Sequence, residues 1–164
     1  GLGCAEQYGV LDQIDFLVGT FGKAIASVGG YIICDSIIRD YLINKMRPLI
    51  FSTALPPISM AWSDFIFNKV LSMQQQRQHL AEISQYLQQA VIAKGFSSPS
   101  SSHIIPVIVG ESQAAIEKAR YVQQQGFYAM PVRPPTVPQN SSRLRISLTA
   151  LVQKNELQQL VECL

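Results

Sequence analysis

The stretch Val18-Gly19-Thr20-Phe21-Gly22-Lys23-Ala24 holds the residue of this sequence best suited to chemistry. Lys23 follows an apolar run over 14–18, and a second apolar run over 28–34 comes shortly after it. The two glycines of the stretch would let the backbone approach a bound molecule closely. A lysine amine placed in this way can form a Schiff base with a carbonyl, and pyridoxal phosphate (PLP) is the common cofactor of that kind. The alternative is a solvated surface lysine.

Arginines frame a rigid, proline-rich loop, Arg133-Pro134-Pro135-Thr136-Val137-Pro138. Beyond it, Arg143 and Arg145 alternate with Leu144 and Ile146, so on a strand both arginines point to one face and both apolar residues to the other. A guanidinium held by a strand is a good bidentate ligand for a carboxylate. The alternative is a pair of arginines on the exposed face of a half-buried sheet.

Two hydroxyl residues lie ahead of a helix start. Ser52 and Thr53 precede Pro56-Pro57, and the second proline can open the next helix. The hydroxyls, with the free backbone amides at a helix N-terminus, could bind a phosphate. Ordinary turn or cap residues are the alternative interpretation.

Length and composition indicate one globular chain with a real core. It has 164 residues, 48% of them hydrophobic and 15% charged, with a formal net charge of +2. So small a charge, spread along the chain, argues against a nucleic-acid surface. No run of about 18 uncharged apolar residues indicates a membrane span, and the first residues lack the pattern of a signal peptide.

The cysteines and histidines are too scattered for a metal site. Cys4, Cys34 and Cys163 are odd in number and form no Cys-x-x-Cys pair, which argues against a disulfide framework and against zinc. His79 and His103 lie far apart without clustered carboxylates or thiols. We therefore expect a reducing, cytoplasmic environment.

The periodicity of apolar residues predicts the elements that position these groups. We expect loop over 1–13 with one helical turn before Gln13, and an extended piece over 49–55. Strands are predicted over 14–18, 28–34, 104–109, 128–133 and 144–148, and helices over 36–47, 58–93 with a break near Ser72, 112–125 and 153–163. From residue 104 onward this order is a compact α+β unit. The two strands around Lys23 need further strands to complete a sheet.

Three separated segments together resemble one family, the α-oxoamine synthases, which are PLP enzymes of fold type I. They are Gly19-Thr20-Phe21-Gly22-Lys23, Phe51-Ser52-Thr53-Ala54-Leu55-Pro56-Pro57, and Arg133 to Pro138 with Arg143-Leu144-Arg145. The resemblance covers essentially the whole chain but only the C-terminal part of the family's length. It implies an α/β fold class: a remnant of the large PLP-binding domain over 1–57, linking helices over 58–95, and a small C-terminal α+β domain over 96–164.

The resemblance also implies a role for each site residue. Lys23 matches the lysine that holds pyridoxal 5'-phosphate as an internal aldimine and later moves the α-proton. Thr20 matches a hydroxyl that contacts the cofactor phosphate, and Ser52 and Thr53 match a segment that reaches the phosphate in the neighbouring subunit of a homodimer. Among the arginines, Arg145 matches the one that binds the amino-acid carboxylate, and the resemblance places Arg133 near the acyl substrate or the same region.

The proline loop looks most like that of the biotin-pathway member, which implies decarboxylative condensation of L-alanine with pimeloyl-CoA or pimeloyl acyl carrier protein. A sister enzyme that uses glycine or serine, such as a 2-amino-3-ketobutyrate ligase, is one alternative. A non-catalytic interaction domain of the same fold is another. The family's pyridine-pairing aspartate, ring-stacking histidine and glycine-rich entry are expected upstream of this sequence. We therefore expect the 164-residue chain to be inactive by itself.

Overall fold

A computed structural model describes residues 3–164 of the chain. It shows two compact units, Gly1–Gln74 and Gln75–Leu164. The three-part division expected from the sequence stays a prediction.

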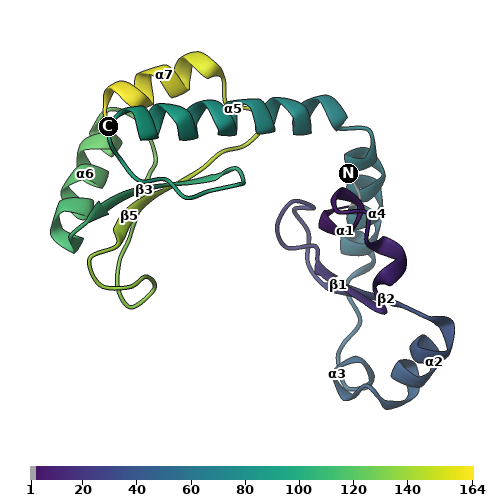
Figure 1. The fold of residues 1–164 in the computed structure, drawn as a ribbon. Helices are drawn as coiled ribbons and strands as arrows, with labels where there is room; N and C mark the ends of the chain where they lie inside the picture. Colours follow the sequence, from purple (N-terminus) through teal and green to yellow (C-terminus); the bar gives the residue numbers. More distant parts are fainter. Residues whose placement is uncertain (1–2) are drawn as a thin grey trace. The chain divides into compact units, whose positions relative to one another are not determined.

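The first unit contains a two-stranded antiparallel sheet (Figure 1), formed by β1 (Phe16–Thr20) and β2 (Gly30–Cys34). Both predicted strands exist, but β1 begins and ends two residues later than expected. Thr20 is therefore the last residue of β1, where it pairs with Gly30. The loop that joins the two strands, residues 21–29, carries Lys23.

Helices make up much of the rest of the first unit. They are α1 (Cys4–Gln7), the short 3-10 helix η1 (Leu11–Gln13), α2 (Ser36–Lys45), α3 (Arg47–Ile50) and α4 (Pro57–Leu71). Asp35 caps α2, because its carboxylate accepts the Ile37 N–H at 2.8 Å.

Two local predictions for the first unit are wrong. The start of the chain has a helix, α1, in addition to the turn before Gln13, and the piece predicted as extended over 49–55 begins with the end of α3. Within α3 the Met46 carbonyl accepts the N–H groups of Leu49 and Ile50, both at 3.0 Å. Pro48 lies in the first turn of α3, where a proline needs no N–H donor.

The first unit leaves most of its apolar side chains exposed. Ile37 is 79% exposed, Ile58 is 77% exposed and Phe51 is 72% exposed. Within residues 3–74, Ala5 and Ser63 are the buried residues. The apolar residues of this unit therefore form no core of their own.

The second unit is a three-stranded antiparallel sheet with helices. In the order β3-β5-β4 the strands are β3 (Ile104–Gly110), β5 (Ser142–Ser147) and β4 (Met130–Val132), and the helices are α5 (Gln74–Ala93), α6 (Ser112–Gln124) and α7 (Lys154–Glu162). The predicted succession of strand, helix, strand, strand and helix is confirmed. So is the break near Ser72, which separates α4 from α5.

One face of this sheet carries the core. Along β5 the side chains of Ser142, Leu144 and Ile146 are buried, while Arg145 and Ser147 between and after them are exposed. The buried face packs against α5, α6 and α7, which supply core residues such as Leu87, Val122 and Leu157 (Figure 1). Burying each large apolar side chain contributes about 1.5–3 kcal/mol. The other face of the sheet carries no helix of this unit.

Among residues 3–164, no helix combines the length and the apolar composition that a membrane crossing requires.

Candidate functional site

The loop that carries Lys23 is a tight, internally bonded turn. The Phe21 N–H donates to the Gly29 carbonyl at 3.0 Å, and the Ala26 N–H donates to the Lys23 carbonyl at 2.9 Å. The Lys23 side chain is exposed, and within the described part of the chain it has no ion-pair partner. Its amine is therefore open to a ligand that approaches the loop.

Two side chains of α4 hold this loop. The indole N–H of Trp62 donates to the Ala26 carbonyl at 2.9 Å, and the hydroxyls of Ser27 and Ser63 lie 2.7 Å apart. The Ser63 hydroxyl also donates to the Ser59 carbonyl at 2.8 Å. The Ser27 hydroxyl also lies 3.4 Å from the same Ser59 carbonyl oxygen, so the two hydroxyls and this carbonyl form one hydrogen-bonded cluster in which either serine can donate to the other.

Gly29 brings the same loop against the segment that precedes α4. Its φ is +97°, and a Cβ at this position would lie 2.6 Å from Cδ1 of Leu55. The positive φ favours glycine here, and any larger residue would also require the end of the Leu55 side chain to shift. Leu55 belongs to residues 51–56, the segment that also carries Ser52 and Thr53.

The polar groups of this region are free to bind. Thr20, Ser52 and Thr53 are exposed, and no hydrogen bond joins their hydroxyls to another of the residues that the structure describes. An unpaired lysine amine can bond to an aldehyde, and free hydroxyls can donate to a phosphate. The chemistry of these exposed groups is of the kind that a cofactor with an aldehyde and a phosphate requires.

A groove of about 670 Å³ lies on the second unit and brings Arg133 and Arg145 together. Arg145 is an exposed residue of β5, on the sheet face that no helix of this unit covers, and Arg133 begins the proline loop. Apolar side chains of β4 and its approach, including Met130, Val132 and Tyr128, line the groove between them. The groove therefore combines two guanidiniums with an apolar surface.

Arg143 is on the same face as Arg145 but has a different environment. It is half-buried, its Nε donates to the Ser141 carbonyl at 2.9 Å, and it does not line the groove. The prediction that both arginines share a face, opposite Leu144 and Ile146, agrees with the burial along β5. Arg143 is therefore bonded to the neighbouring backbone, whereas the side chain of Arg145 is open to a ligand.

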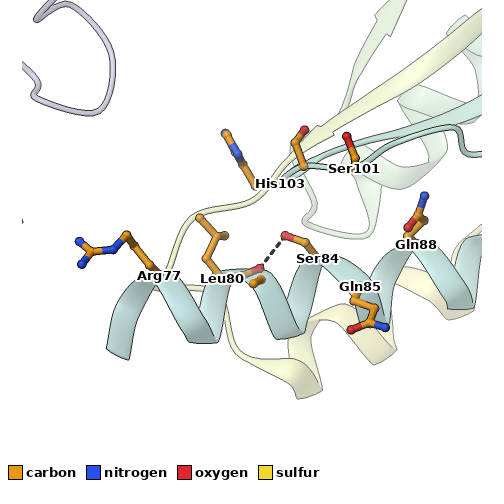
Figure 2. A pocket seen from close by; sticks show the side chains of 9 residues that line it. Arg77, Leu80, Ser84, Gln85, Gln88, Ser101 and His103 are labelled. Atoms are coloured by element: carbon orange, nitrogen blue, oxygen red, sulfur yellow. Dashed lines mark hydrogen bonds between the residues drawn. The ribbon is translucent and has the colours of Figure 1, made fainter. Parts of the chain in front are cut away.

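A second cavity, of about 340 Å³, lies between α5 and the loop over 101–103 (Figure 2). Ser84 and Gln88 of α5 and His103 of the loop are among its lining residues. Two of the polar side chains that the helix contributes are already bonded, since Ser84 donates to the Leu80 carbonyl at 2.6 Å, the dashed line in Figure 2, and Gln88 donates to the Ser98 and Ser100 carbonyls. None of the predicted site residues lines this cavity.

No group of three metal-ligating side chains occurs among residues 3–164. His79 is bonded to protein, with Nε2 at 2.9 Å from the Val152 carbonyl oxygen.

The predicted site residues are divided between the two units. Thr20, Lys23, Ser52 and Thr53 belong to the first, and Arg133 and Arg145 to the second. Sequence reasoning missed Trp62, Ser63 and Ser27, which hold the loop. The one available signal was that Trp62 is the single tryptophan of the chain and lies in the helix that follows Pro56-Pro57.

Comparison with known proteins gives these residues a context. The sequence matches the family described as aminotransferase class I and II over residues 4–164. It is 54% identical over 165 residues both to a putative 8-amino-7-oxononanoate synthase of Pasteurella multocida and to the 8-amino-7-oxononanoate synthase of Haemophilus ducreyi. Each alignment covers 100% of this chain and 43% of the relative, so the chain spans less than half the length of these relatives.

Solved structures show the same fold. Serine palmitoyltransferase of Sphingomonas wittichii superimposes with a TM-score of 0.91 at 30% identity, over 99% of this chain and 42% of that one. A serine palmitoyltransferase of S. paucimobilis with a bound PLP–myriocin aldimine gives 0.88 at 27% identity, over 99% and 42%. The 8-amino-7-oxononanoate synthase of Francisella tularensis gives 0.79 at 24% identity, over 90% and 44%, a likeness of fold. The resemblance and the α/β fold class expected from the sequence are confirmed.

Proposed function

The chain belongs to the aminotransferase class I and II family, and from this premise we propose that it is the C-terminal part of a PLP-dependent acyltransferase that makes 8-amino-7-oxononanoate. The reaction condenses L-alanine with pimeloyl-CoA or pimeloyl acyl carrier protein and releases carbon dioxide and the free thiol. The protein would work in the cytoplasm as a homodimer. Its relatives in Pasteurella multocida and Haemophilus ducreyi support this assignment.

The groove that holds both Arg133 and Arg145 is the observation that carries the proposal. The two residues belong to different elements, yet they line one groove whose other walls are largely apolar. An amino-acid carboxylate needs a guanidinium, and an acyl chain needs an apolar surface. A substrate pair of alanine and a long acyl thioester has both requirements.

Each predicted site residue has a defined role in this proposal. When bound, PLP supplies an electron sink for the carbanion at the amino-acid α-carbon. Lys23 binds the cofactor through its amine and moves the proton at the α-carbon, while Thr20, Ser52 and Thr53 hold the phosphate, the last two for the partner subunit. Arg145 holds the alanine carboxylate, which orients one α-carbon bond for cleavage. Arg133 contacts the acyl substrate.

A chimera tests the proposal. This chain would replace the matching part of the Haemophilus ducreyi enzyme, to which it is 54% identical. We expect alanine-dependent release of coenzyme A from pimeloyl-CoA, and loss of both activity and cofactor absorbance in a Lys23→Ala variant. The 164-residue chain alone should release no coenzyme A.

Two results would contradict the assignment. A chimera that prefers glycine to alanine would point to a sister enzyme of the same family. A chimera that folds but takes up no PLP would indicate a non-catalytic interaction domain. The parent Haemophilus ducreyi enzyme, assayed in parallel, is the control.

A further inference from the structure

We propose that Trp62 and Ser63 of α4 are positioning residues for Lys23. The inference rests on the proposed function, since it concerns the orientation of the lysine that would bind the cofactor. Neither residue touches the reacting atoms in this proposal. Both act through the backbone of the loop over 21–29.

The first link between the loop and α4 begins at the turn that contains Lys23. The Ala26 N–H closes this turn by donating to the Lys23 carbonyl at 2.9 Å. The carbonyl of the same Ala26 accepts the indole N–H of Trp62 at 2.9 Å, from 36 residues further along the chain. Ala26 thus links the lysine turn directly to α4.

A second link joins the next residue. The hydroxyls of Ser27 and Ser63 are bonded to each other at 2.7 Å, and both reach the Ser59 carbonyl, at 3.4 Å and 2.8 Å, so a cluster of hydroxyls joins the loop to the helix backbone. Ser63 is 9% exposed and is one of the two buried residues among residues 3–74. A buried hydroxyl with both its donor and acceptor functions satisfied holds one geometry.

Backbone hydrogen bonds such as Ser27 N–H to the Phe21 carbonyl close the loop on itself, and the Trp62 and Ser63 links are the side-chain hydrogen bonds that join it to α4. Lys23 itself is exposed and makes no ion pair within the described residues. Ala26 has a φ of +49°, a conformation that costs a non-glycine residue energy and persists only where the surroundings enforce it. The indole N–H bonds to the carbonyl of this strained residue, and the hydroxyl cluster begins at the next residue, Ser27.

The first experiment needs no cofactor. Amide hydrogen exchange in the cofactor-free chimera should show faster exchange at Ala26 and Ser27 in Trp62→Phe and in Ser63→Ala, with the amides of β1 and β2 unchanged. Trp62→Phe keeps the aromatic contact with Phe65 and removes the N–H donor. Asn68→Ala is the matched control, because it removes hydrogen bonds within α4 to Asp64 and leaves the loop untouched.

The second experiment measures Lys23 in the loaded chimera. For Trp62→Phe we expect a kcat about three- to tenfold lower with the KM for alanine little changed, and a shifted pH midpoint of the Lys23-bound cofactor absorbance. We expect the same changes in kcat and in absorbance midpoint for Ser63→Ala. The variant Ser63→Thr, which keeps the hydroxyl, should restore both quantities. Borohydride reduction followed by mass spectrometry then reports whether the pyridoxyl group is on Lys23.

These experiments distinguish failure of the proposed function from failure of the inference about Trp62 and Ser63. If the unsubstituted chimera carries no reducible cofactor on Lys23, the proposed function fails and the inference fails with it. If that chimera is loaded and active, but Trp62→Phe matches it in kcat, in absorbance midpoint and in exchange at Ala26, the inference alone is overturned. A fall in thermal stability with all three values unchanged would also overturn it, since that result indicates a merely structural role.

Discussion

Arg145 lies directly opposite Met130 in the antiparallel register of β5 and β4, and both side chains line the groove on the helix-free face of the sheet. The pairing places a guanidinium beside an apolar side chain at a defined position of the ladder. A carboxylate bound by Arg145 would therefore lie in a groove that also exposes the apolar side chain of Met130.

Replacing Arg145 by glutamine should weaken binding of the amino acid. The guanidinium is exposed, so the change removes the ligand contact and leaves the core intact. Charge-assisted hydrogen bonds contribute about 1.5–3 kcal/mol, which corresponds to a roughly 10- to 150-fold fall in kcat/KM for alanine. Steady-state kinetics of the chimera measure this, and an unchanged kcat/KM would remove Arg145 from the proposed site.

Arg143→Gln is the matched control for that measurement. Its Nε–H bonds to the Ser141 carbonyl, so we expect a loss of stability of about 1 kcal/mol and an unchanged KM for alanine. Thermal unfolding and kinetics on the same preparation separate the two effects. A larger kinetic effect from Arg143 than from Arg145 would reverse the assignment of the two arginines.

Ala26→Gly should stabilise the folded chimera. The φ of +49° at Ala26 lies in the left-handed region, where glycine has no steric penalty. The gain is partly offset by the greater conformational freedom of an unfolded glycine, which leaves about 0.5–1 kcal/mol. Denaturant titration measures the difference in unfolding free energy, and a destabilised variant would contradict the backbone conformation described above.

Residues 75–164 should fold without the rest of the chain. This unit contains nearly all of the buried apolar side chains, and its sheet and three helices enclose one core. We expect a single cooperative unfolding transition for this piece. Residues 3–74 alone should bind a hydrophobic dye strongly and show no such transition, because their apolar side chains are largely exposed. Calorimetry and dye fluorescence decide both points.

Leu144→Ala should destabilise the second unit severely. Leu144 is 0% exposed and lies in β5, the central strand of the sheet. Truncation of a leucine in such a position costs about 2–5 kcal/mol through lost burial and the cavity that remains. Ser147→Ala, on the exposed face of the same strand, is the control and should change the unfolding free energy by less than about 0.5 kcal/mol.

The sequence predicted the second unit well because its signals are local and repeated. The alternation of apolar and charged residues along β5 predicted that Leu144 and Arg145 lie on opposite faces of the sheet. The helical periodicity of apolar residues predicted α6 and α7. The break near Ser72 was predicted because the helical stretch over 58–93 is long for a single helix. In this unit each residue's neighbours in sequence largely determine whether it is buried.

The first unit was harder to predict because its contacts join residues far apart in sequence. The bond from Trp62 to Ala26 and the contact of Gly29 with Leu55 leave no trace in any short window. The helical turn of α3 was missed because Leu49 to Leu55 reads as an apolar run bounded by prolines, a pattern that strands and buried helices share. The roles of Lys23, Thr20, Ser52 and Thr53 stay predictions.

The contact of Gly29 with Leu55 has a consequence for recombination among related genes. A residue other than glycine at position 29 would need a positive φ and a shifted or smaller side chain at position 55, so the Lys23 loop and the segment before α4 depend on each other. Crossovers placed between residues 29 and 55 would combine unmatched halves of this contact. Shuffled libraries should therefore recover functional progeny mainly from crossovers outside that interval.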